Sequence, residues 1–160
     1  MFQKIFLFFL ILGITASCSK SDSNPDFSAI DKQIIEEYLT VNKLTAKSTS
    51  SGLYYFITTP GGAVHPTINS TVTVNYNGYL ANGTVFDHSA SGKPLTIALN
   101  SVIQGWQEGL KLIGTGGKIK LLIPSAMGYG SSNQYNSAGQ IVIPMNSVTI
   151  FDVELVSFTN

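Results

Sequence analysis

The segment V-I-Q-G-W-Q-E-G, residues 102–109, marks the place where the periodicity of the chain changes. Apolar residues here recur at helical spacing, as at Val102 and Trp106, whereas the segments on both sides alternate between apolar and polar residues. Gly105 and Gly109 would each cost a helix about 1 kcal/mol relative to alanine. We therefore expect one short helix that packs closely against a sheet or leaves room for the indole.

Strands are expected on both sides of this helix. Alternating apolar and polar residues are typical of half-buried strands, and Asn82-Gly83 is a strong signal for a tight turn between two of them. The predicted strands lie at residues 53–58, 72–77, 84–86, 95–99, 119–123 and 151–155, and residues 130–141 are predicted to form a long loop. The order predicts an α+β fold in which a twisted antiparallel sheet wraps around one short helix.

The N-terminus has the features of an export signal. Residues 1–18 contain a lysine near the start, an apolar run too short to span a membrane, and small residues just before Cys18. Cys18 is the only cysteine, so it cannot form an internal disulfide. The pattern resembles a bacterial lipobox, although Thr15 stands where a larger apolar residue is usual. We predict a lipid-anchored protein of the bacterial cell envelope that faces the periplasm or the exterior; a plain secreted protein is the alternative.

The segment after Cys18 divides into three parts. Residues 19–27 are polar and are predicted to be a tether. Residues 28–50 are predicted to be a helical extension and linker, with a helix over 28–44 that begins with a capping box formed by Ser28 and Asp31. We expect this helix to pack on the domain or on a second copy without taking part in the site. Residues 51–160 form the predicted main domain.

Composition excludes several classes of partner. The net charge is zero and 11% of residues are charged, which argues against nucleic-acid binding because such proteins need a cationic face. His65 and His88 have no cysteine or acid at metal-ligand spacing, so we expect no metal site and place both on the surface. The remaining chemistry would have to come from an apolar pocket.

Several local phrases, taken in order, resemble the FKBP-type peptidyl-prolyl cis-trans isomerase domain over roughly residues 52–158. These phrases are V-N-Y-N-G-Y-L (74–80), N-G-T-V-F-D (82–87), V-I-Q-G-W-Q-E-G (102–109), A-M-G-Y-G (126–130), I-V-I-P (141–144) and I-F-D-V-E-L (150–155). The resemblance implies an isomerase that acts on proline-containing polypeptides, assists the folding of exported proteins, needs no cofactor and can bind macrolide inhibitors.

The resemblance also implies which residues form the pocket. The catalytic positions fall on Tyr76, Phe86, Asp87, Trp106, Tyr129 and Phe151, and the substrate-binding positions on Leu95, Val102, Ile103, Val142 and Ile143. By this resemblance Trp106 is the pocket floor, the Tyr129 hydroxyl and the Ile103 N–H bind substrate carbonyls, and Asp87 orients a tyrosine. Leu95 departs from the family, where an aromatic residue is usual, and the loop 131–140 is unlike the shorter, proline-containing versions.

Two other classes of function remain open. A non-catalytic peptide-binding or chaperone (holdase) lipoprotein would use the same groove, and turnover on a proline peptide would distinguish it from an isomerase. A glycan-binding lipoprotein would need aromatic residues exposed on an open face, whereas the spacing here points them inward.

Overall fold

The computed structural model describes residues 26–160, so the predicted signal segment, Cys18 and most of the tether lie outside the described residues. The helices are α1 (Phe27–Val41) and α2 (Gln104–Gly109), with short 3-10 segments η1 (Leu99–Ser101), η2 (Leu110–Leu112) and η3 (Ser125–Met127). The strands are β1 (Lys47–Ser48), β2 (Tyr54–Thr59), β3 (Thr71–Leu80), β4 (Val85–His88), β5 (Leu95–Ala98), β6 (Lys118–Ile123), β7 (Gln134–Tyr135), β8 (Ile141–Ile143) and β9 (Thr149–Thr159). Within residues 26–160, no helix is long and apolar enough to cross a bilayer.

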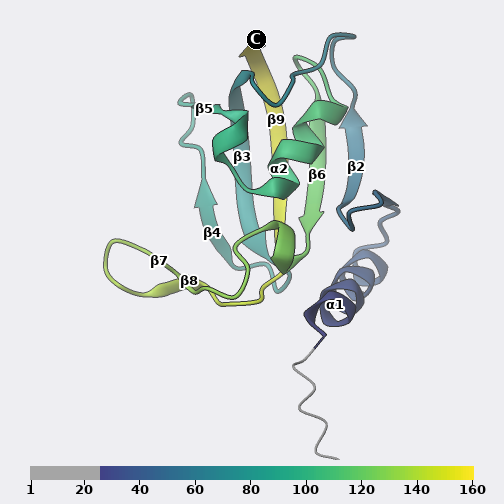
Figure 1. Ribbon diagram of the computed structural model, residues 1–160, viewed down its shortest axis with the longest axis vertical. Coiled ribbons are helices and arrows are strands. Elements are labelled where there is room, and N and C mark those ends of the chain that lie inside the picture. Colours follow the sequence, from purple (N-terminus) through teal and green to yellow (C-terminus); the bar gives the residue numbers. More distant parts are fainter. Residues whose placement is uncertain (1–25) are drawn as a thin grey trace, which may run out of the picture.

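One antiparallel sheet organises the domain. Its strand order is β1-β2-β6-β9-β3-β4, and β5 pairs with the other part of β3. Helix α2 lies across one face of this sheet, as Figure 1 shows. The prediction of an antiparallel sheet with one short central helix is confirmed.

Alternation along β9 sorts side chains between the two faces of the sheet. Phe151, Val153 and Leu155 belong to the apolar core that contains Trp106 of α2. Ile150, one residue out of phase, belongs to a second apolar cluster on the opposite face. The period of two that predicted this strand therefore decides which residues can reach the α2 side.

The glycines of α2 allow the helix to lie close against β6. A Cβ on Gly105 would come within 2.6 Å of the side chain of Ile123, and one on Gly109 would overlap Leu121. Such contacts are shorter than real side chains tolerate, so both positions need glycine. The expectation of close packing on a sheet is correct.

Helix α1 packs against the domain, on the face of the sheet away from α2. Ile35 is fully buried against Leu122, Val148 and Ile150. Its beginning differs from our expectation, because the side chain of Asp26 caps the helix by accepting a hydrogen bond from the backbone N–H of Ser28. A hydrogen bond from the Ser28 hydroxyl, together with this backbone bond, lowers the pKa of Asp26.

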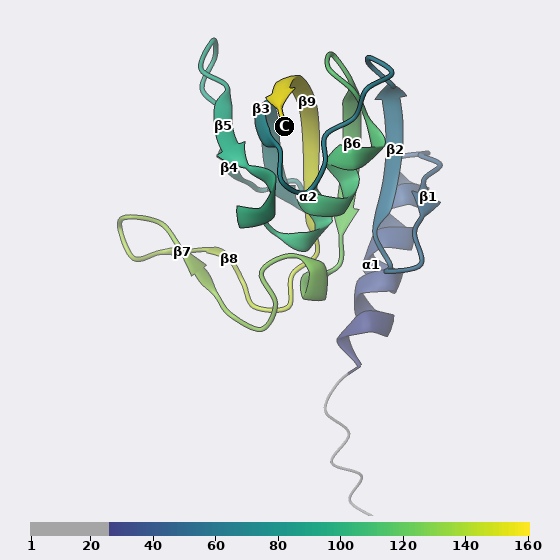
Figure 2. The same ribbon diagram turned by 45° about the horizontal axis from the view of Figure 1, so that its top comes forward.

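Two segments contain more structure than the sequence indicated. The expected linker includes β1, which pairs with β2 and so adds a strand to the sheet of the domain. The expected long loop includes β7, which pairs with β8 in a two-stranded hairpin. Figures 1 and 2 show that this hairpin extends to one side of the main sheet.

Candidate active site

A cavity of about 240 Å³ lies where α2, the main sheet and the loop after η3 meet. Its lining comes from segments far apart in the sequence: Tyr76, Asp87, Leu95, Ser101, Val102, Ile103, Trp106, Tyr129 and Phe151. Eight of these nine were predicted site residues, and Ser101 was not. The fold therefore brings most of the predicted pocket together.

Aromatic rings form the floor and one wall of the cavity. Trp106 is 4% exposed, and its ring meets those of Tyr76 and Phe151 edge to face, with centroids 5.3 Å apart in both pairs. Phe86 lies outside the lining, where its ring contacts Phe151 at 5.5 Å and Tyr129 at 6.4 Å. Edge-to-face packing of this kind fixes ring orientation beyond what burial alone provides.

Gly78 of β3 is a structural residue of the site that the sequence analysis missed. A Cβ at this position would lie 2.7 Å from the Phe151 ring and 2.8 Å from the Phe86 ring. Only glycine leaves room for both rings at this point of the strand. The signal was present in the sequence as a glycine inside an otherwise regular strand, which often marks a close approach.

The one carboxylate of the lining is bound to a tyrosine. The Tyr76 hydroxyl donates a 2.7 Å hydrogen bond to Oδ2 of Asp87, and the backbone N–H of His88 donates to Oδ1 at 2.9 Å. Burial and this bond to Asp87 raise the pKa of Tyr76 above its usual value. The arrangement keeps Tyr76 protonated and fixed, which suits an orienting role for Asp87 better than proton exchange.

Polar groups at the cavity remain available for a ligand. Among hydrogen bonds found within residues 26–160, none uses the Tyr129 hydroxyl or the Ile103 N–H. The indole N–H of Trp106 is buried and likewise has no acceptor in the described part of the chain. Burial, followed by the charge of Asp87, raises the pKa of Tyr129. Tyr129 is therefore a hydrogen-bond donor at neutral pH.

The sequence pattern of the FKBP-type peptidyl-prolyl cis-trans isomerase family matches residues 62–156. The chain belongs to this family. The cavity lies within the matched segment, whereas α1 and β1 precede it. The resemblance on which the site residues were chosen is thus confirmed at the level of family.

Individual relatives agree. FkpA of Buchnera aphidicola subsp. Schizaphis graminum is 45% identical over 148 residues, which are 88% of this chain and 56% of that protein. FkpA of Escherichia coli strain K12 is 47% identical over 110 residues, 68% of this chain and 38% of that protein. The chain spans about half the length of the curated relatives it matches.

Solved structures of the family share the fold. The crystal structure of FkpA from Escherichia coli superposes with a TM-score of 0.69 at 41% identity, covering 82% of this chain and 61% of that one. A peptidyl-prolyl cis-trans isomerase from Pseudomonas syringae pv. tomato gives 0.68 at 28% identity, covering 86% and 99%.

Two predicted substrate-binding residues of this family member lie away from the cavity lining. Val142 and Ile143 sit in β8, and Ile143 is 3% exposed and paired with Gln134 of the hairpin. The hairpin follows the loop that carries Tyr129 in the sequence. Val142 and Ile143 are therefore connected to the site by the chain, but they do not line the cavity. Any substrate contact of theirs remains a prediction.

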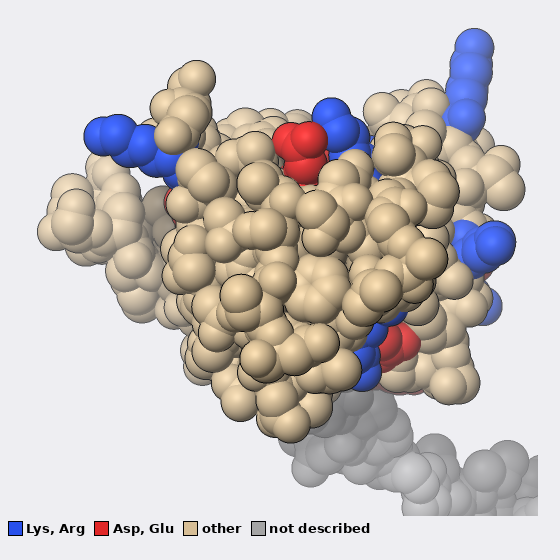
Figure 3. Space-filling model, turned by 90° about the horizontal axis from the view of Figure 1, so that it is seen from above, with Lys and Arg blue, Asp and Glu red and all other residues tan. Residues whose placement is uncertain are grey.

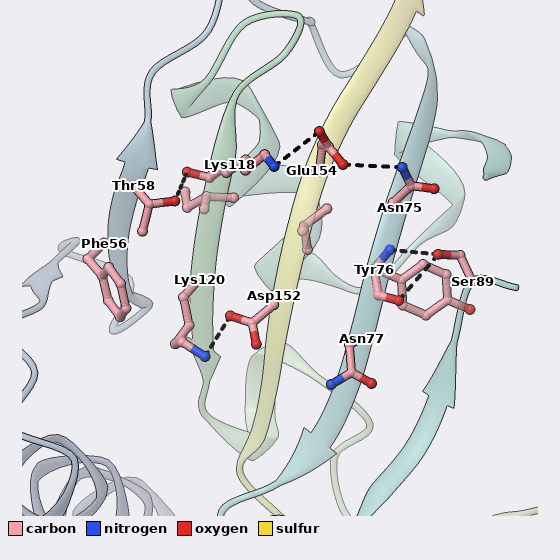
Figure 4. A pocket seen from close by; sticks show the side chains of 12 residues that line it. Phe56, Thr58, Asn75, Tyr76, Asn77, Ser89, Lys118, Lys120, Asp152 and Glu154 are labelled. Atoms are coloured by element: carbon pink, nitrogen blue, oxygen red, sulfur yellow. Dashed lines mark hydrogen bonds and ion pairs between the residues drawn. The ribbon is translucent and has the colours of Figure 1, made fainter. Parts of the chain in front are cut away.

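A larger hollow of about 360 Å³ lies on the opposite face of the sheet (Figure 4). Its charged side chains are already paired: Lys118 with Glu154 at 3.4 Å and Lys120 with Asp152 at 2.5 Å. The Lys118–Glu154 pair is open to solvent, and such pairs contribute little energy. Neither Trp106 nor Tyr129 lines this hollow.

The described residues show no cluster of cations on the face drawn in Figure 3 and no group of metal-ligand side chains. On the face shown in Figure 3, lysine side chains are separated from one another among uncharged residues. Among residues 26–160, no three His, Cys, Asp or Glu side chains are grouped as metal ligands would be.

Proposed function

We propose that this protein is a peptidyl-prolyl cis-trans isomerase that works by non-covalent catalysis in the cavity beside Trp106. The observation that carries the proposal is an aromatic cavity of about 240 Å³ at whose edge the Tyr129 hydroxyl and the Ile103 N–H face no protein acceptor. A proline ring is apolar and compact, and the flanking peptide carbonyls are hydrogen-bond acceptors. The lining matches both requirements.

The chemistry requires differential binding alone. Rotation about a peptide bond faces a barrier of about 18–20 kcal/mol, because resonance gives the C–N bond double-bond character. The twisted transition state has lost this resonance and is less dipolar than the planar amide. A dry aromatic cavity therefore favours the twisted form, and each tenfold acceleration requires about 1.4 kcal/mol of preference for it. No bond is broken, so the mechanism needs neither a metal nor a cofactor.

Each polar residue has a role in this proposal. The Tyr129 hydroxyl and the Ile103 N–H bind carbonyls on either side of the rotating bond and so hold the peptide while the bond turns. Asp87 fixes the Tyr76 hydroxyl at 2.7 Å, which keeps that ring against Trp106. Proline-containing polypeptides are thus the substrates, and compact proline-mimicking macrolides are the expected inhibitors.

The proposed place of action is the bacterial cell envelope. The signal-like segment and the single Cys18 support export followed by lipidation, with the protein facing the periplasm or exterior. Stable anchoring needs more than one acyl chain, since a single chain binds only marginally. Replacing Cys18 with alanine should move the protein to the soluble fraction, and retention in the membrane fraction would refute the anchor.

A protease-coupled isomerisation assay tests the activity on residues 19–160, which contain every element that the structure describes. Cis-trans exchange of an X-Pro peptide should be faster than without the protein, where it takes tens to hundreds of seconds. Uncatalysed exchange together with suppressed aggregation of an unfolded protein would instead support the holdase function. The glycan-binding alternative is disfavoured because the rings beside the cavity pack edge to face against one another.

A further inference from the structure

Asp31 connects the N-terminal helix to the segment that carries Tyr129. It lies on α1, outside the segment matched by the family, and is 1% exposed. Its Oδ2 accepts two hydrogen bonds from Ser125, one from the backbone N–H at 2.8 Å and one from the hydroxyl at 2.7 Å. Ser125 is the first residue of η3. It is 3% exposed and lies 94 residues after Asp31 in the sequence.

Ser125 in turn holds both neighbours of Tyr129. Its backbone carbonyl accepts from the N–H of Gly128 at 3.0 Å and from the N–H of Gly130 at 2.8 Å. Tyr129 stands between these two glycines and lines the cavity. An unbroken chain of hydrogen bonds therefore leads from the carboxylate of Asp31, through Ser125, to the backbone on both sides of Tyr129.

Attachment of the helix does not explain a carboxylate at this position. Helix α1 is already held by Ile35 in the apolar cluster and by Tyr38, whose hydroxyl lies 3.3 Å from that of Tyr79. Burying a carboxylate is costly unless its oxygens are hydrogen-bonded, and Oδ1 of Asp31 is buried with no partner among the described residues. If attachment of the helix were the only role of this position, an apolar residue would serve at a lower desolvation cost. Asp31 instead makes two strong hydrogen bonds to one serine.

We propose that Asp31 is a positioning residue for Tyr129, through which the N-terminal extension sets the place of the Tyr129 hydroxyl at the cavity. The proposal rests on the function proposed above for that hydroxyl. It also revises the expectation that the extension takes no part in the site. Glycine permits many backbone conformations, so a tyrosine flanked by glycines depends on an external anchor for its position.

The test compares two substitutions at Asp31 with two controls on the same helix, all in residues 19–160. Asp31→Ala removes the acceptor and should lower kcat/KM severalfold, by no more than loss of the Tyr129 hydroxyl does, because small displacements of a binding group have large effects. Asp31→Asn should restore most of it, since one amide oxygen can accept both bonds that Oδ2 now accepts. Glu37→Ala removes an exposed charge, and Ile35→Ala weakens helix packing without touching Ser125.

A double-mutant cycle separates positioning from general destabilisation. Tyr129→Phe should lower kcat/KM severalfold in the wild-type, Glu37→Ala and Ile35→Ala backgrounds, and by less than about twofold in the Asp31→Ala background. This pattern would show that Asp31 acts through the hydroxyl. An equal loss in all backgrounds, or a loss from Ile35→Ala as large as that from Asp31→Ala at equal folded fraction, would overturn the proposal.

A second readout does not depend on turnover. Amide NMR signals of Gly128 and Gly130, and ring signals of Tyr129, should shift in Asp31→Ala and stay near their wild-type positions in Asp31→Asn and Glu37→Ala. If the wild type lacks isomerase activity, the proposed function fails, yet these spectra still decide whether Asp31 positions Tyr129. Signals unchanged in folded Asp31→Ala would overturn the inference.

Discussion

The Tyr76 hydroxyl donates a 2.7 Å hydrogen bond to Asp87, so the one carboxylate of the cavity lining is engaged by a residue of the same lining. We expect Asp87→Ala and Tyr76→Phe each to lower kcat/KM severalfold, since each removes the hydrogen bond that fixes the Tyr76 ring against Trp106. The double variant should lose little more than either single one, because both remove the same bond. Losses that multiply in the peptide assay would show that Asp87 acts independently of Tyr76.

Three tyrosines predict how stability depends on pH: Tyr76 and Tyr129 of the cavity, and Tyr79 on the other face of the sheet. Burial and neighbouring carboxylates raise the pKa of Tyr76, Tyr79 and Tyr129 in the folded protein. The contribution of these protonated tyrosines to folding stability is fully present below the unfolded pKa of 10.0. It is lost as the pH rises from there through the higher pKa values of the folded protein. Urea denaturation should show stability falling above about pH 10. Tyr79→Phe should make that decline shallower, and an equally steep decline would contradict the assigned cause.

Much of this architecture follows from sequence periodicity, because burial on one face imposes a period of two on strands. Phe151, Val153 and Leu155 alternate in the sequence and all reach the core beside Trp106. The two glycines of α2 also predicted close packing on the sheet, because glycine is costly in a short helix unless a neighbour comes close. Eight residues chosen from the family resemblance line the cavity, and their roles in binding and catalysis stay predictions.

The errors concern features set by distant partners. Ser28 and Asp31 have the spacing of a capping box, yet Asp26 caps the helix and Asp31 binds Ser125, 94 residues away. Local spacing cannot tell whether Asp31 caps the helix or binds elsewhere, because Ser125 lies far outside the short segment in which a capping box is recognised. The polar composition of residues 130–141 also hid β7, which pairs with β8.

Gly78 should tolerate no side chain. We expect Gly78→Ala to displace the rings of Phe86 and Phe151, to cost about 1–3 kcal/mol of stability through overpacking, and to lower turnover. Gly62→Ala is a matched control, because a Cβ there would lie 3.8 Å from its nearest neighbour. Urea denaturation of both variants measures the difference. Equal stability would mean that the two rings move aside at no cost.

Leu95 lines the cavity at a position where an aromatic residue is usual in the family. Leu95→Phe should add apolar contact worth up to roughly 1 kcal/mol at about 25 cal/mol per Å², and so tighten binding of a proline-mimicking macrolide severalfold. Titration followed by fluorescence of Trp106, the only tryptophan, measures both dissociation constants. Equal affinities with an intact fold would show that residue 95 does not contact the inhibitor.

Exchange NMR on an X-Pro peptide at equilibrium tests the central claim most directly, because it measures cis-trans interconversion without a coupling protease. Residues 19–160 should accelerate exchange in proportion to their concentration. Trp106→Ala, which removes the floor of the cavity and should cost about 3–5 kcal/mol of stability, should abolish most of this acceleration in the fraction that remains folded. Exchange at the uncatalysed rate with the wild type, or undiminished acceleration by folded Trp106→Ala, would contradict catalysis in this cavity.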